Sequence, residues 1–205
     1  MLTRLAPVPD PLLLPMADQP PVERADAARN REALLCAARR LVEERGVGCV
    51  TMEAVAAAAG VGKGTVFRRF ESREGLMAAV LDFSETAWQA SVISGPPPLG
   101  PGADPWDRLL AFGRSRLETT LLHADLIRAA GATGSRAAGA YSFTALHVQH
   151  LLSELGVDGD LPLLATALLA PLEVPIIERQ QAGGFPVERL LTGWEDLARR
   201  VTGRR

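Results

Sequence analysis

The chain has 205 residues, of which 47% are hydrophobic and 5% aromatic, and it carries a net charge of −2 at pH 7 and two cysteines. The near-neutral charge excludes a protein that coats nucleic acid through its overall field, although a local basic patch remains open. Two cysteines are too few for the disulfide framework of a small secreted domain, and a composition rich in alanine and leucine favours helices over a β-sandwich. We therefore expect an all-α protein of the reducing cytoplasm.

Residues 1–25 are expected to form a disordered arm, because prolines interrupt their apolar run before it reaches the length of a signal peptide. The most apolar later stretch, residues 161–177, is broken by prolines and a glutamate, so it is shorter than the roughly 20 residues that span a bilayer. No membrane anchor is expected. Cys36 and Cys49 are interpreted as small apolar core side chains, with a redox-sensing pair as the alternative.

Two helices are predicted first in chain order. In residues 27–45, apolar side chains recur at the spacing of one helix face, and Gly46 follows Arg45 as a C-terminal stop. Residues 51–59 form a second, shorter pattern, in which Thr51 is the expected N-cap and Gly60 the end.

The stretch GVGKGTVFRRF, residues 60–70, has the glycines and lysine of a phosphate-binding loop, but a P-loop needs G-x-x-x-x-G-K-[ST], and here Ala57 and Gly64 occupy two of the required positions. A Rossmann turn also fails, since the alanine-rich segment before Gly60 favours a helix over a buried strand. Two helices joined by a glycine turn, the second over residues 62–70, fit better, with Val61 filling the angle between them.

The predicted second helix and its end are locally basic. Lys63, Arg68, Arg69 and Arg73 face a single acid, Glu71, in residues 62–73, and Lys63 is the only lysine of the chain. A charge cluster alone is more often a solvated surface than a ligand site. Combined with the paired helices and the glycine turn, it favours a DNA-reading unit.

Residues 31–76 resemble the N-terminal DNA-binding domain of the TetR/AcrR family of bacterial transcriptional regulators, through the motif T-x-x-x-V-A-x-x-A-G-V followed by G-T-V-F-x-x-F-x-S-R-E-x-L. The resemblance implies a DNA-binding domain at residues 26–75 and a helical ligand-binding and dimerisation domain at residues 76–205. It also implies the DNA-binding residues Thr51, Lys63, Gly64, Thr65, Phe67, Arg68, Arg69 and Arg73.

Three positions depart from the family pattern. Phe67 replaces the usual tyrosine, so it can pack against a sugar or a thymine methyl but cannot donate an O–H to phosphate. Arg69 replaces a common histidine or tyrosine and adds a possible phosphate partner. Gly62 stands where serine is frequent and removes a hydroxyl at the start of the second helix.

After the proline-rich residues 94–105, a long helical pattern begins at Trp106 and continues to Leu122, a shorter one follows over HADLIRAAG, and another long one spans residues 141–155. These helices are predicted to enclose an apolar cavity for a small molecule, although an ordinary core would give the same pattern. The candidate lining residues are Trp106, Leu110, Phe112, Leu117, Tyr141, Phe143 and His147. His123, His147 and His150 lack acidic or cysteine neighbours at metal-site spacing, so no metal and no cofactor is expected.

The last two patterns are apolar helices, the first kinked at Pro171 and Pro175 and the second beginning with Pro186 as its first helical residue. In the TetR/AcrR family the last two long helices pack against their copies in a second subunit. The resemblance therefore implies a homodimer interface formed by Leu168, Leu172, Ile176, Leu190, Leu191, Trp194 and Leu197.

The sequence thus predicts a ligand-responsive transcriptional regulator, most simply a repressor, that binds a palindromic double-stranded DNA operator as a homodimer and is released by a small-molecule effector. Two alternatives remain open. One is an enzyme in the C-terminal half, although no known catalytic motif is present. The other is a helical protein-interaction module.

Overall fold

The computed structural model describes residues 22–130 and 135–204, and within these ranges it contains helices and no strand. The N-terminal helices are α1 (Val22–Arg45), the short 3-10 helix η1 (Val47–Cys49), α2 (Met52–Ala59) and α3 (Lys63–Phe70). The remaining helices are α4 (Arg73–Ser94), α5 (Pro105–Ala130), α6 (Ser135–Glu154), α7 (Leu161–Leu169), η2 (Ala170–Leu172), α8 (Val174–Ala182) and α9 (Val187–Val201). The predicted all-α class is confirmed.

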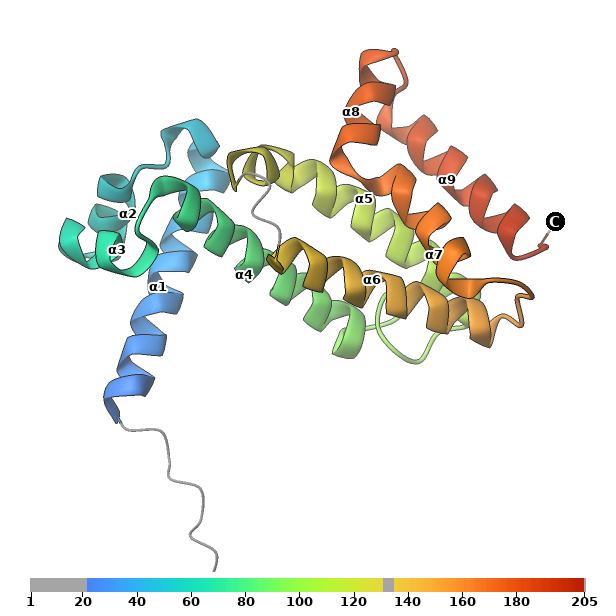
Figure 1. Cartoon of the computed structure of the whole chain (residues 1–205), viewed down its shortest axis with the longest axis horizontal. Coiled ribbons are helices and arrows are strands. Elements are labelled where there is room, and N and C mark those ends of the chain that lie inside the picture. Colours follow the sequence, from blue (N-terminus) through green and yellow to red (C-terminus); the bar gives the residue numbers. More distant parts are fainter. Residues whose placement is uncertain (1–21, 131–134, 205) are drawn as a thin grey trace, which may run out of the picture.

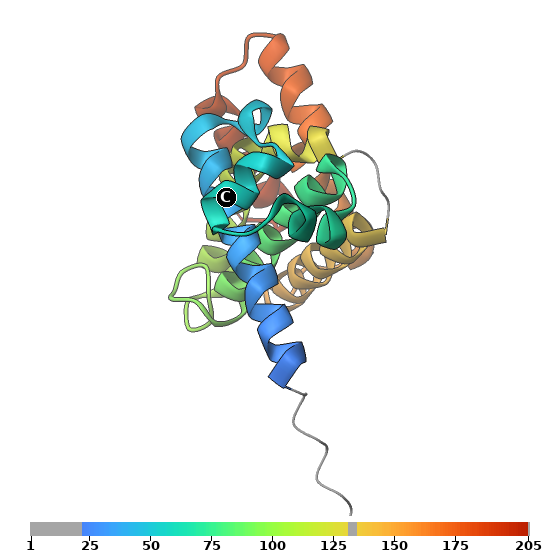
Figure 2. The same cartoon turned by 90° about the vertical axis from the view of Figure 1, so that its left-hand side faces the viewer.

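The molecule is elongated, with α1, α2 and α3 at one end and α8 and α9 at the other, while α4 and α5 run between them (Figure 1). Viewed onto the first end, α1 and the two short helices lie in front of the remaining helices (Figure 2). The arm predicted for residues 1–25 lies mostly outside the described residues, and α1 begins at Val22.

Two separate hydrophobic cores hold the chain together. The first contains buried side chains of α1, η1, α2, α3 and the first half of α4, and it also takes in Leu126 and Ala130 from the end of α5. The second contains the last turns of α4, most of α5, and α6 to α9. α4 and α5 contribute side chains to both cores and therefore connect the two ends of the molecule.

The local signals of the N-terminal part predict its helices well. Thr51 caps α2, since its Oγ1 accepts a hydrogen bond from the backbone N–H of Ala54 at 3.1 Å. Gly60 ends α2 with φ of 68°, a left-handed conformation that costs glycine little. α1 is longer than expected, starting at Val22 instead of about Ala27.

In the C-terminal part, two predictions were wrong and one is confirmed. The two helices expected between Trp106 and Ala130 are the single helix α5, because no glycine or proline interrupts the chain between Leu117 and Ala130. The predicted kink is present, since α7 with η2 meets α8 at an angle of 49°. Pro186 is the N-cap of α9 and not its first helical residue.

The two cysteines are not core residues. Cys36 on α1 and Cys49 at the end of η1 are both exposed and free. Each cysteine therefore lies on the solvent side of its helix, while apolar residues of the same helix face the first core.

No single described helix is both long enough and apolar enough to cross a membrane; only the bent pair of α7 with η2 and α8 meets both conditions together.

Candidate nucleic-acid interface

Helices α2 and α3 are joined by a short turn at Gly60 to Gly62. The backbone N–H of Val61 donates to the carbonyl of Ala56 at 3.0 Å, and Val61 packs against the first core between the two helices, where it was predicted. Val55 and Val66 are fully buried, and Phe70 is nearly so. The apolar face of each helix thus faces the core, and the opposite face of α3 is left to solvent.

The solvent face of α3 carries most of the predicted DNA-binding residues. Lys63, Gly64, Phe67, Arg68 and Arg69 are exposed, and Thr65 is half-buried. Phe67 is 40% exposed, which is unusual for an aromatic side chain. A Cβ added at Gly64 would meet no atom within 4 Å, so the start of α3 presents open backbone that a ligand can approach closely.

Lys63 has two partners in its own chain. Its Nζ forms an ion pair with Glu53 Oε1 on α2, and it lies 5.3 Å from the centroid of the Phe67 ring. The hydrogen bond from Lys63 lowers the pKa of the Glu53 carboxyl below its usual value. Sequence reasoning missed Glu53, because the angle between α2 and α3 alone brings positions 53 and 63 together.

Arg69 connects α3 to α1. Its Nη2 donates a hydrogen bond to the backbone carbonyl of Ala27, so part of its donor capacity is used within the protein. Beside this contact lies a groove of about 340 Å³ between α1 and α3, which carries three guanidinium groups and no acid. Its lining residues are Ala27, Asn30, Arg31, Leu34, Thr65, Arg68 and Arg69.

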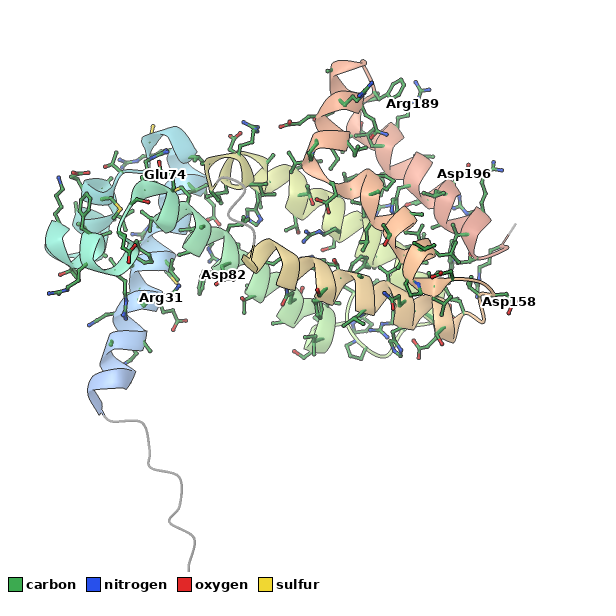
Figure 3. All side chains as sticks on the ribbon, viewed as in Figure 1. Arg31, Glu74, Asp82, Asp158, Arg189 and Asp196 are labelled. Carbon is green, nitrogen blue, oxygen red and sulfur yellow. The ribbon has the colours of Figure 1, made fainter. Side chains whose placement is uncertain are left out.

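The α1 side of this groove was absent from the sequence predictions. Arg31 lies on α1 at the same end of the molecule as α2 and α3 (Figure 3). The basic surface therefore extends from α3 onto α1.

Arg73 makes contacts that differ from those predicted for it. Its Nε donates to the carbonyl of Val50 at 2.9 Å and its Nη2 donates to the carbonyl of Val47 at 2.6 Å. These bonds tie the start of α4 to the segment that leads into Thr51. In this structure Arg73 supports the segment before α2 from within the domain, and two of its guanidinium N–H donors are engaged by backbone oxygens.

Three of the predicted ligand-pocket residues, Phe112, Phe143 and His147, form a cluster of rings with Trp88. Phe112 and Leu117 are buried in the second core, and Trp106, Leu110, Phe143 and His147 are half-buried. The Phe112 ring lies 5.4 Å from Trp88 and 5.2 Å from His147, between centroids. The side chain of Tyr141 lies outside the described residues.

His147 is the polar member of this cluster. Its Nε2 is buried without a hydrogen-bond partner. Burial first, and then the nearby charges of Arg108 and His150, lower the pKa of His147 to about 4. The imidazole is therefore neutral at pH 7 and offers an unused polar atom beside two aromatic rings.

Two grooves of the C-terminal part lie on the other side of α5. One of about 280 Å³ runs between α5, α8 and α9, and of the predicted pocket residues only Leu117 lines it. A second of about 220 Å³ lies between α5 and α8 and is lined by Thr120, Arg128 and Glu178 among others. Within the described ranges, no three His, Cys, Asp or Glu side chains lie close enough together to hold a metal ion.

Three of the predicted interface residues face the interior of their own chain. Leu168, Leu172 and Trp194 are at most 2% exposed, and Trp194 Nε1 donates to the carbonyl of Leu168 at 2.7 Å. They cannot contact a second subunit in this conformation, because they are buried in the second core of their own chain. Ile176 is 41% exposed, and Leu190, Leu191 and Leu197 are half-buried, so these four remain available.

A capped helix, a left-handed glycine and a second helix with an exposed basic face define the class of helix-turn-helix DNA-binding proteins. Comparison with known proteins gives the family. The profile of bacterial regulatory proteins of the tetR family matches residues 34–80. No curated protein matches the sequence.

Solved structures agree with this match. A TetR-family transcriptional regulator from Pectobacterium atrosepticum is similar with a TM-score of 0.70 and 23% identity, over 87% of this chain and 96% of that one. A transcriptional regulator from Saccharomonospora viridis in complex with choline has a TM-score of 0.62 and 19% identity, over 82% and 95%. The FadR repressor of Thermus thermophilus in complex with lauroyl-CoA has a TM-score of 0.57 and 21% identity, over 82% and 92%.

At these identities the likeness establishes a shared fold. Together with the match at residues 34–80, it confirms the resemblance found in the sequence: residues 34–80 match the tetR family of bacterial regulatory proteins, and the chain shares the fold of a solved TetR-family transcriptional regulator.

Proposed function

We propose that the protein is a cytoplasmic, ligand-responsive repressor that binds a palindromic operator as a homodimer. The observation that carries this proposal is the exposed face of α3, where Lys63, Phe67 and Arg68 stand clear of a core formed by Val66 and Phe70. A helix of this kind fits the major groove, with its first turn closest to the base edges. Phosphate contacts position such a helix and side-chain contacts to bases give it specificity.

Within this proposal, Thr51, Gly64 and Thr65 approach the DNA backbone through their backbone N–H groups and hydroxyls. Lys63, Arg68 and Arg69 supply the positive charge, and Phe67 contacts a sugar or a thymine methyl. Arg73 acts indirectly, by holding the segment before Thr51 through the carbonyls of Val47 and Val50.

Dimerisation is proposed for the end of the molecule formed by α8 and α9. Ile176 on α8 exposes an apolar side chain, and the half-buried Leu190, Leu191 and Leu197 lie on α9. A two-fold axis near this surface would place two copies of α3 on one face of the DNA. Half-sites separated by roughly 34 to 36 Å, or a multiple of this distance, would then be read together.

The effector is proposed to act through α4 and α5, which contribute to both hydrophobic cores. These helices are joined by the ion pair in which Arg116 Nη1 donates to both carboxylate oxygens of Glu85, and by the hydrogen bond from Trp88 Nε1 to Ser115 Oγ. Two DNA-binding domains of a dimer can fit the operator only in one relative arrangement. A small molecule lowers DNA affinity only if it binds that arrangement more weakly than it binds a different arrangement of the two domains. The choline and lauroyl-CoA complexes of the two similar proteins are examples of small-molecule binding on this fold.

Selection of genomic DNA fragments with the purified protein tests this function. Fragments that share an inverted repeat, and that are released when a metabolite is added, are the expected result. Recovery of fragments without a common sequence would contradict the proposal, and so would a strictly monomeric species in sedimentation at micromolar concentration.

Arg68→Ala is expected to weaken operator binding and, if Arg68 contacts a base, to relax the preference at that base pair. Arg40→Ala is the matched control, because Arg40 is an exposed arginine on α1 that faces Glu44. Equal operator affinity of the Arg68 variant and the wild-type protein would exclude a contact role for Arg68.

A further inference from the structure

An acidic side chain stands within the proposed DNA-binding surface. Glu53 occupies the first turn of α2, two residues after Thr51, and its carboxylate contacts the Nζ of Lys63 at the start of α3. The side chains of both residues are more than half exposed, so the pair lies on the surface and not in the core. Lys63 is the only lysine of the chain and lies in the turn of α3 that comes closest to DNA.

We infer that Glu53 restrains Lys63 in the free protein and thereby limits DNA binding that does not depend on sequence. This inference rests on the proposed DNA-binding function. To reach a phosphate, the Lys63 ammonium must leave the Glu53 carboxylate, and the carboxylate is then left beside a polyanion. Both steps oppose binding to any duplex, whatever its sequence.

Glu53 also makes contacts at the N-terminus of α2. Its carboxylate accepts hydrogen bonds from its own backbone N–H and from the Thr51 hydroxyl. Lys63 has one further neighbour, the Phe67 ring at 5.3 Å, which can hold the ammonium by a cation–π interaction once Glu53 is removed. Loss of the carboxylate therefore leaves Lys63 at the surface and free to reach phosphate.

The expected size of the effect follows from ordinary surface electrostatics. An exposed ion pair and a like charge near a phosphate each change an equilibrium only modestly in water. Replacing Glu53 by glutamine should raise the affinity for non-specific duplex by about 3-fold to 10-fold for each DNA-binding head. The logarithmic salt dependence should become steeper by about 0.9 per head, since one more phosphate is fully neutralised.

The experiment measures fluorescence anisotropy of a labelled 30-base-pair duplex of random sequence over a range of salt concentrations. It compares the wild-type protein with Glu53→Gln, Lys63→Gln and the double variant. Glu74→Gln is the matched control, because Glu74 is an exposed first-turn acid of α4 in the same domain and makes no contact with Lys63. Like Glu53→Gln, the Glu74→Gln substitution removes one negative charge, but it leaves the ion pair of Glu53 with Lys63 intact.

Glu53→Gln is expected to bind more tightly than the wild type and with a steeper salt dependence, while Glu74→Gln changes neither quantity to the same extent. The gain should shrink in the Lys63→Gln background, because the restraint acts through Lys63. Unchanged or weaker binding by Glu53→Gln, or an equal gain with and without Lys63, would overturn the inference. If the wild-type protein does not bind duplex DNA at all, the proposed function itself fails, which is a separate outcome.

Discussion

At Gly113, α5 packs directly against the Trp194 ring of α9. A Cβ added at this position would lie 2.0 Å from the Trp194 ring, closer than any real contact. The ring cannot retreat freely, because its Nε1 donates to the carbonyl of Leu168 at 2.7 Å. Gly113→Ala should therefore either displace Trp194 or force the two helices apart.

The size of this effect can be worked from its parts. Overpacking a well-filled core costs about 1 to 3 kcal/mol, and loss of the indole hydrogen bond adds about 1 kcal/mol. The higher helix propensity of alanine returns about 1 kcal/mol. The variant should lose about 1 to 3 kcal/mol of unfolding free energy, which corresponds to a Tm lower by about 2 to 10 °C for a chain of this length.

Thermal unfolding followed by circular dichroism at one fixed protein concentration measures this loss. Gly193→Ala is the control, because Gly193 lies on α9 one position before Trp194 and a Cβ there would meet no atom within 4 Å. It should be neutral or slightly stabilising. A Gly113→Ala variant as stable as Gly193→Ala would refute the described packing of α5 against α9, and with it the surface proposed for dimerisation.

Three further predictions concern other parts of the molecule. Thr51→Ala removes the acceptor for the Ala54 N–H and should cost about 1 kcal/mol of stability, and Thr51→Ser should restore it, as measured by urea unfolding. Arg73→Gln should destabilise the protein by about 1.5 to 3 kcal/mol, because the carbonyls of Val47 and Val50 lose a charged donor; an equally stable variant would show that these bonds contribute nothing. The pKa of His147 is about 4 in the fold and near 6.5 in the unfolded chain, so the unfolded chain binds the proton more readily. The free energy of unfolding should therefore fall as pH drops from about 6.5 to 4, by about 2 to 3 kcal/mol in total. His147→Phe should flatten that part of the profile, and an unaltered profile would contradict a neutral, buried imidazole.

The N-terminal helices could be predicted from the sequence because their boundaries depend on local chemistry. Thr51 and Gly60 act on their own backbone neighbours. Val66 and Phe70 are four residues apart, and this spacing defines one helix face without knowledge of the rest of the fold. The resemblance to the family motif then predicted the function of the exposed face, which local rules alone do not give.

Contacts between helices could not be predicted in the same way. The pairing of Lys63 with Glu53 and the use of Arg73 within the domain depend on interhelical angles that the sequence does not state. The apolar stripe of α9 predicts which of its side chains become buried. It does not predict that Gly113 on α5 leaves the space that the Trp194 ring occupies. For this reason Trp194 was expected at a subunit interface and lies in the core of its own subunit.

The central claim is that the start of α3 contacts duplex DNA, and the single lysine of the chain allows a direct measurement. Acetylation of Lys63 by an amine-reactive ester can be followed by mass spectrometry in the free protein and in the complex with a selected DNA fragment. If the start of α3 contacts DNA, Lys63 is protected from acetylation when the DNA is bound. An acetylation rate that is the same in the free protein and in a saturated complex would contradict it.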